Sequence, residues 1–213
     1  MRTRKRLKGL QKWMQENLCA GREMKAPAPN FDITQIIRQE PECYIAWQPT
    51  RPDLSGRFQN DVQNVCPGIL IMPAASKVKD MEEKRFDRYN GVSRPKDLGQ
   101  TLSVSILFSV YEPGIRLPGF IDDPEDMSKI IEGTEEGLFT LTDWMDEFIE
   151  KLLGTQYIPG TDLFMNESSA AYSLYTDQSY VVDKRPIYYG FVNVEFGCYA
   201  NAGNNPNIDN YLK

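Results

Sequence analysis

The segment Thr101–Tyr111 constrains the fold more than any other part of the sequence. Its even-numbered side chains, from Leu102 to Val110, are all apolar, and they alternate with positions that are mostly serine or threonine. Successive side chains of a β-strand point to opposite faces, so this pattern predicts a strand with one face in a core. The register is strongly specified, because a shift of one residue would bury the serines.

A second strand is predicted near the C-terminus, over 183–199, and Pro186 should lie at its beginning because proline has no N–H for a ladder. One face carries Tyr188, Val192, Val194, Phe196 and Cys198. The other face carries Tyr189, Phe191, Asn193, Glu195 and Tyr199. The first face suits a core. The second mixes aromatic rings with an amide and a carboxylate, so we expect it to meet water or a partner.

Two amphipathic helices are predicted. The first spans 3–20 and ends at Gly21, and its apolar stripe is Leu7, Leu10, Met14 and Leu18. The second spans 134–153 and ends at Gly154. Its stripe is Leu138, Leu141, Met145, Phe148, Ile149 and Leu152, with Trp144 at the border. We interpret both as helices that cover a sheet, with docking onto a partner as the alternative for the first.

Shorter elements are expected between these: an extended linker over 26–29, a helical turn over 32–39, and strands over 43–48, 65–72 and 168–176, with Pro73 closing the strand before it. The order predicts an α+β fold, a mainly antiparallel sheet covered on one face by two helices, with long loop or hairpin excursions. We divide the chain into a basic N-terminal helix and linker (1–29), one α+β domain (30–200) with charged excursions at 74–99 and 112–136, and a polar tail (201–213).

The composition is that of a globular protein, with 41% hydrophobic and 25% charged residues among 213. No apolar run approaches the roughly 20 residues that cross a bilayer, and the basic N-terminus lacks the apolar stretch of a secretory signal. Cytoplasmic synthesis is therefore expected. There is no histidine, and the four cysteines form no CxxC pair. We expect buried free thiols and no metal or other cofactor.

Charge is distributed unevenly along the chain. Residues 1–29 carry a net charge of +6 and the remainder −12. The basic segment has no aromatic or Arg-Gly pattern typical of nucleic-acid binding, so docking on an acidic neighbouring subunit is the favoured interpretation. The excursion at 74–99 mixes both signs, and 112–136 is strongly acidic but lacks the ligand spacing of an EF-hand.

The order of these elements resembles the tail terminator, or tail completion, proteins of tailed bacteriophages and related contractile particles. The resemblance covers about 65–199: the alternating strand 101–111, the acidic excursion, the helix 138–153, a strand, and the closing segment from Arg185 to Val194. It implies a virion protein at the tail–neck junction, assembled in the host cytoplasm as a ring of six subunits. Such a ring ends tube polymerisation and offers a surface to the neck.

The implied partners are other copies of the chain, the tail tube protein, a neck, collar or connector protein, and the sheath in a contractile tail. DNA would only pass through the lumen. A head-to-tail ring needs two different surfaces on each subunit. The candidate contact residues are Arg4, Lys5, Arg6, Lys84, Arg85, Arg88, Asp122, Asp123, Glu125, Tyr189, Phe191, Glu195 and Tyr199. We expect the basic first helix and the acidic excursion to be complementary.

Two other functions remain open. One is a neck or connector subunit, which would contact DNA or the portal. The other is an enzyme, which would have to rely on carboxylates or lysines because the sequence lacks histidine, a Gly-rich phosphate loop and a GxSxG motif.

Overall fold

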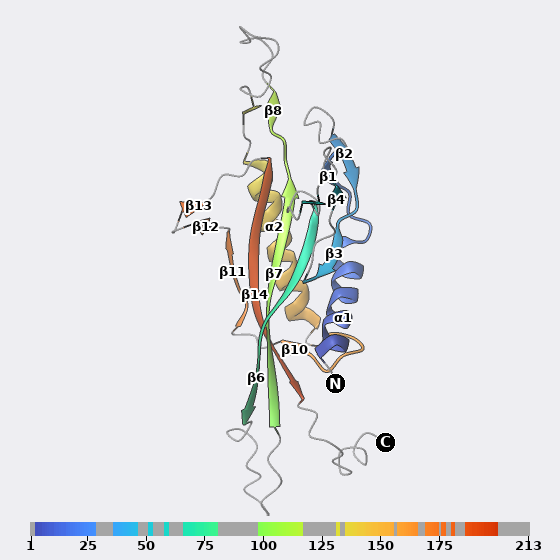
Figure 1. The fold of residues 1–213 in the computed structure, drawn as a ribbon, viewed down its shortest axis with the longest axis vertical. Coiled ribbons are helices and arrows are strands. Elements are labelled where there is room, and N and C mark those ends of the chain that lie inside the picture. Colours follow the sequence, from blue (N-terminus) through green and yellow to red (C-terminus); the bar gives the residue numbers. More distant parts are fainter. Residues whose placement is uncertain are drawn as a thin grey trace, which may run out of the picture.

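The computed structural model describes residues 3–28, 36–46, 51–52, 58–59, 66–80, 98–116, 131–132, 135–155, 157–165, 169–174, 176–177, 180–181 and 186–199. Its centre is one six-stranded sheet, in which a long antiparallel trio, β6–β7–β14, is flanked by shorter strands (Figure 1). The strands are β3 (Glu42–Ile45), β6 (Gly68–Asp80), β7 (Leu98–Tyr111), β10 (Phe164–Met165), β11 (Ala171–Leu174) and β14 (Ile187–Tyr199). The only parallel pair among these is β3 with β6.

Two helices lie side by side on one face of this sheet (Figure 1). The first is α1 (Thr3–Met14), which continues as a π-helical turn, η1 (Gln15–Cys19). The second is α2 (Glu136–Thr155). The chain leaves the first helix at Gly21, whose positive φ of 74° suits a residue without a side chain. The predicted α+β architecture, a mainly antiparallel sheet with two helices on one face, is therefore confirmed.

Four two-stranded sheets in the described residues are not hydrogen-bonded to the main sheet. They pair β1 (Met24–Pro27) with β2 (Ile36–Gln39), β4 (Arg51–Pro52) with β5 (Phe58–Gln59), β8 (Ile115–Arg116) with β9 (Ile131–Glu132), and β12 (Thr176–Asp177) with β13 (Tyr180–Val181). The 26–29 linker is thus partly a strand. The part of the predicted helical turn that the structure describes, 36–39, is also a strand, because Ile36 and Ile37 are β-branched and pair with β1.

The core lies between the helices and the sheet, and it follows the predicted pattern. The even-numbered side chains of β7 from Leu102 to Val110 are all buried there. They meet Val192, Val194 and Phe196 of β14 and the apolar stripe of α1. Packing includes aromatic contacts of Phe108 with Trp144 and Phe148. Since α1 belongs to this core, the basic N-terminal helix covers the sheet of its own chain.

Three local predictions were wrong. Pro73 does not close its strand, because a register shift between Pro73 and Ala75 lets β6 continue to Asp80. Trp144 is not at the border of the apolar side of α2 but fully buried, because the end of the first helical segment packs against it. Gly154 does not end α2, which runs to Thr155.

The sheet is longer than the helix layer that covers it. β6 and β7 pair from Gly68 with Ser109 as far as Asp80 with Leu98, and the two strands run on past the helices at one end (Figure 1). The excursion predicted at 74–99 is therefore a hairpin extension where the structure describes it, at 74–80 and 98–99. Residues 81–97 lie outside the described residues.

Candidate interaction surfaces

Arg4 and Lys5 are exposed on α1, whereas Arg6, predicted with them as a partner contact, is buried with only 1% of its surface exposed. Arg6 Nε donates to Asp162 Oδ1 at 2.9 Å and Nη2 donates to Asp162 Oδ2 at 2.7 Å. Nη1 donates to Gln100 Oε1 at 2.6 Å. Arg6 therefore links α1 to β7 and to the segment after α2, and the prediction that it is a surface contact was wrong.

The Arg6–Asp162 pair changes the protonation equilibria of both groups. The hydrogen bond to Asp162 raises the pKa of Arg6 further, although burial alone would lower it. Burial raises the pKa of Asp162, but the hydrogen bonds and charge of Arg6 outweigh that effect and lower it. Both residues are therefore charged at neutral pH, and the fork geometry of the guanidinium matches the carboxylate.

The second face of β14 is only partly open, which corrects the prediction for Tyr189. Tyr189 is buried in a second apolar cluster on the sheet face opposite the helices, and Phe191 is half-buried against it. The buried members of this cluster are Cys66, Leu70, Leu107, Tyr111, Ile187 and Tyr189. This cluster was not evident from the sequence, because Leu107 and Tyr111 are the only large side chains among the odd-numbered positions of 101–111, and the others are serine or threonine.

Glu195 is half-buried, and its main chain is held by Ser169, whose Oγ accepts from Glu195 N at 3.0 Å and donates to Glu195 O at 3.1 Å. Tyr199 pairs through its backbone with Gly99, but its side chain lies outside the described residues. Six other candidate contacts also lie outside them: Lys84, Arg85, Arg88, Asp122, Asp123 and Glu125.

The outward face of α2 combines acidic residues with exposed apolar residues that the sequence pattern did not single out as contacts. Its exposed stripe, here called the α2 stripe, consists of Phe139, Asp143, Asp146, Glu150 and Leu153. Phe139 is 51% exposed and Leu153 45% exposed, and Tyr157, just past the helix, is 55% exposed. The spacing of four, three, four and three residues places the stripe along one side of the helix. Phe139 and Leu153 were not part of the apolar stripe predicted for this helix, and Asp143, Asp146 and Glu150 were expected to lie outside that stripe.

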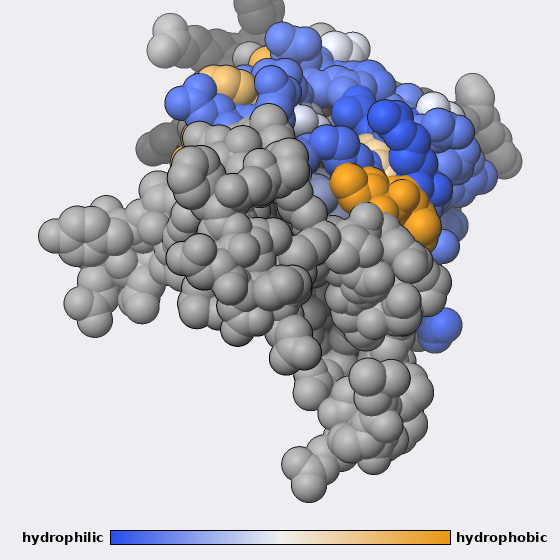
Figure 2. Space-filling model, turned by 90° about the horizontal axis from the view of Figure 1, so that it is seen from above, coloured by the Kyte–Doolittle hydropathy of each residue, from blue (hydrophilic) through white to orange (hydrophobic). Residues whose placement is uncertain are grey.

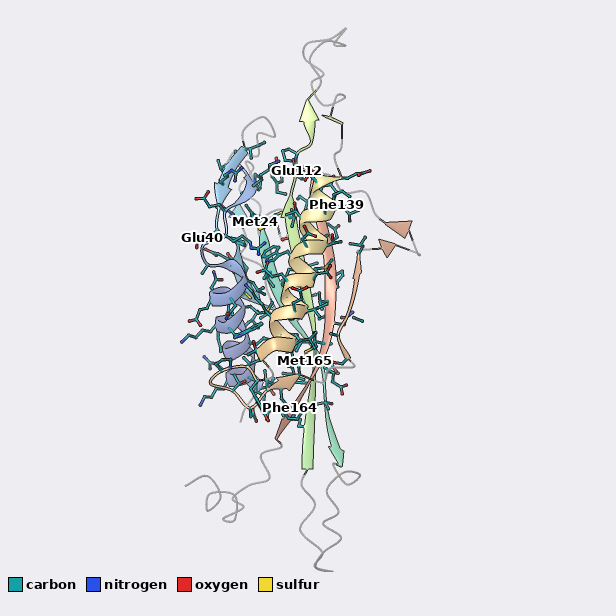
Figure 3. The ribbon with its side chains drawn as sticks, turned by 180° about the vertical axis from the view of Figure 1, so that it is seen from behind. Met24, Glu40, Glu112, Phe139, Phe164 and Met165 are labelled. Atoms are coloured by element: carbon teal, nitrogen blue, oxygen red, sulfur yellow. The ribbon has the colours of Figure 1, made fainter. Side chains whose placement is uncertain are left out.

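Exposed apolar side chains are otherwise scarce in the part of the chain that the structure describes. The remaining large one is Ile36 in β2. Seen from the end where β1, β2 and β8 lie, the coloured surface is mostly hydrophilic with small hydrophobic patches (Figure 2). Of the four exposed large hydrophobic residues described, three therefore lie on α2 or directly after it. Phe139 is seen near the N-terminal end of that helix in Figure 3.

The inner side of α2 is joined to the end of the first helical segment by charged groups. Arg22 pairs with Glu147 and lies over the ring of Trp144, 5.5 Å from its centre. Lys151 pairs with Glu147 at 2.7 Å and donates to Asn17 O. Burial raises the pKa of Glu147, but the hydrogen bonds from Lys151 and Arg22 lower it below its usual value. This network holds the two helices together within one chain.

The described residues offer little reactive chemistry. No group of three or more metal-binding side chains is found among them. Cys19, Cys43, Cys66 and Cys198 are all buried and free, as predicted. Burial raises the pKa of Cys19 to about 12 and also raises those of the other three thiols. These cysteines are therefore protonated at neutral pH and are weak nucleophiles.

Comparison with models of known protein families and with curated proteins gave no match to this sequence. None of the helices in the described residues is long and apolar enough to cross a membrane.

Proposed function

We propose that this chain is a tail terminator of a tailed phage or a related contractile particle, a structural protein whose ring of six subunits caps the tail tube. The order of β7, α2, β11 and β14 supports the proposal, since it is the order on which the resemblance rests. In this function the protein acts by binding other proteins, without a cofactor and without catalysis.

The observation that carries the proposal is the difference between the two ends of the sheet. At one end β6 and β7 extend past the helices as a long hairpin (Figure 1). At the other end β7 is followed by Glu112, which is buried and accepts from Lys25 of β1 at 2.5 Å, and then by the short β8–β9 pair (Figure 1). A subunit that joins a tube on one side and a neck on the other needs two unlike ends, and the long β6–β7 extension at one end and the short β8–β9 pair at the other fit that need.

The ring would sit at the junction of tail and neck. Its partners would be the last ring of the tube, a neck, collar or connector protein, and the sheath where the tail is contractile. DNA would pass through the lumen without being read.

The test is the assembly state of the purified chain. Sedimentation velocity and negative-stain microscopy at micromolar concentration are expected to give closed rings with six-fold symmetry. A monomer under all conditions would overturn the proposal. Tight DNA binding by the isolated protein, measured by fluorescence anisotropy at physiological salt, would instead identify a neck or connector subunit.

A further inference from the structure

The α2 stripe has the composition of an interaction surface. Its centre is acidic, with Asp143, Asp146 and Glu150, and its ends are the exposed apolar residues Phe139 and Leu153. Among the described residues, the three acids of the stripe form no ion pair, whereas Glu147 on the inner side is paired twice. A surface that carries both charged and apolar side chains can bind a partner of opposite charge through ion pairs and apolar contacts together.

The outward face of α1 has the opposite charge. Arg4, Lys5, Lys8 and Lys12, here called the α1 stripe, are all exposed. Positions 4, 8 and 12 are each one helical turn apart, so their side chains lie along one side of the helix. The long stems of lysine and arginine can pack on apolar side chains while their charged ends reach carboxylates. The α1 stripe therefore complements both the acids and the apolar residues of the α2 stripe.

The two stripes lie on neighbouring helices of the layer that covers one face of the sheet. α1 packs beside β3, at one edge of the sheet, whereas α2 packs against β7 and β14, toward the other edge. Seen from the helix side, α1 and α2 are next to each other with α1 at the outer margin (Figure 3). The contacts between them within one chain include those of Trp13 with Phe148 and of Arg22 with Glu147, and these residues lie outside both stripes.

We propose that the α1 stripe of one copy binds the α2 stripe of the next copy, so that each subunit gives one stripe and receives the other. This inference rests on the proposed ring and names the surface that closes it. Such a contact is heterologous, as a ring with cyclic symmetry requires. The pair expected from the sequence was the basic first helix with the acidic 112–136 excursion. The contact proposed here keeps the basic helix without Arg6, which is buried, and takes α2 as its acidic partner.

The proposal makes the ring sensitive to salt. Exposed ion pairs are individually weak and are screened over about 10 Å at 0.1 M salt. Association through several such pairs should therefore weaken as salt rises, and the apolar contacts of Phe139 and Leu153 should retain part of the affinity.

The test uses two charge reversals that leave the fold intact. Lys5→Glu/Lys8→Glu places acids in the first half of α1, where the helix dipole tolerates them. Asp143→Lys/Asp146→Lys replaces aspartate by a better helix former. Each variant alone is expected to associate roughly tenfold more weakly at low salt, because attractive contacts become repulsive. The readout is sedimentation velocity at low and high salt, with circular dichroism to check folding.

The decisive measurement is an equimolar mixture of the two variants. The acidic α1 of one variant then faces the lysines on α2 of the other, and the two unmodified stripes face each other, so an alternating ring of even number should form again. Glu23→Lys and Arg38→Glu, exposed charges outside both stripes, are the matched controls and should assemble as the unmodified chain does.

The possible results separate the two proposals. If either reversed variant still forms rings as well as the unmodified chain does, this contact is overturned but the proposed ring is not. Rings lost in each variant and not restored by mixing would also overturn the contact. Only an unmodified chain that stays monomeric would overturn the ring.

Discussion

Arg6 and Asp162, 156 positions apart in the sequence, form a two-bond ion pair at 2.9 and 2.7 Å. Arg6 is fully enclosed, whereas Asp162 keeps 17% of its side chain exposed. The pair joins the first helix to the segment that follows the second, and Gln100 extends it to β7. The first turn of α1 is therefore fixed to the body of the protein by a charged contact in addition to its apolar stripe.

Replacing Arg6 by alanine should destabilise the protein by about 3 kcal/mol, because a paired buried cation is removed and its partners are left unpaired. Arg6→Lys should recover only part of this loss, since lysine lacks the two-pronged geometry. Urea unfolding followed by circular dichroism measures both. Arg4→Ala, on the exposed side of the same turn, should change stability by no more than about 0.5 kcal/mol. Equal losses for Arg4 and Arg6 would contradict the structure.

The same pair predicts how stability depends on pH. The pKa of Asp162 in the folded chain is lower than its ordinary value of 3.8. The unfolded chain therefore takes up the proton first, and the stabilisation is complete above about pH 4 and is lost as the pH falls further. Asp162→Asn should remove this part of the acid sensitivity, so the unfolding midpoint of the variant should fall less steeply below about pH 4. An unchanged slope would show that other carboxylates dominate.

Trp144 should be more sensitive than Trp13 to replacement by phenylalanine, because only Trp144 has an indole hydrogen bond to the described residues. Its indole Nε1 donates to Leu18 O at 3.3 Å, and its ring meets Phe108 edge-on at 5.3 Å. Trp144→Phe leaves the buried carbonyl without its donor, which costs about 1–3 kcal/mol. Trp13→Phe is the matched control, because the indole of Trp13 makes no hydrogen bond to the described residues. Chemical unfolding distinguishes the two, and a larger loss for Trp13 would be contrary to expectation.

Gly197 and Phe164 form a close contact between β14 and β10. A Cβ atom at Gly197 would lie 2.2 Å from the ring of Phe164, so the ring must move when alanine is introduced. Gly197→Ala should therefore cost about 1–3 kcal/mol by overpacking. In the double variant Phe164→Ala/Gly197→Ala the cost should be smaller than the sum of the two single changes. A double-mutant cycle measures this coupling, and strict additivity would refute the predicted clash.

The sequence predicted the elements whose periodicity is unbroken. The alternation from Leu102 to Val110 gave β7 and its buried face correctly, and the stripe that includes Leu7 and Met14 gave the first helix. A single residue pattern is sufficient there, because each side chain needs only to be apolar and correctly spaced. The segment 36–39 was predicted wrongly, since a short β-branched pair has no period and its partner strand β1 is set by tertiary structure.

The candidate contacts could be predicted less well, because exposure depends on what packs nearby. Arg6 and Lys5 are adjacent basic residues with no difference in sequence pattern, but only Arg6 faces Asp162, whose position depends on the folded chain. Tyr189 was predicted on an open face because the polar neighbours of Leu107 concealed a second cluster. Phe139 and Leu153 lie outside the predicted apolar stripe of the second helix and are exposed, but the stripe pattern alone did not identify them as candidate contacts.

The position of Asp162 also determines when the first helix can settle during synthesis. At roughly 5–20 residues per second, the ribosome needs about 8–30 s to progress from Arg6 to Asp162. β14, which supplies Val192, Val194 and Phe196 to the core that α1 joins, is made later still. During that interval not all of the strands that bury the apolar side of α1 have been synthesised. The N-terminal segment of the nascent chain therefore exposes apolar side chains that can bind other proteins. Chaperone binding to stalled chains should therefore end only after Tyr199 has emerged.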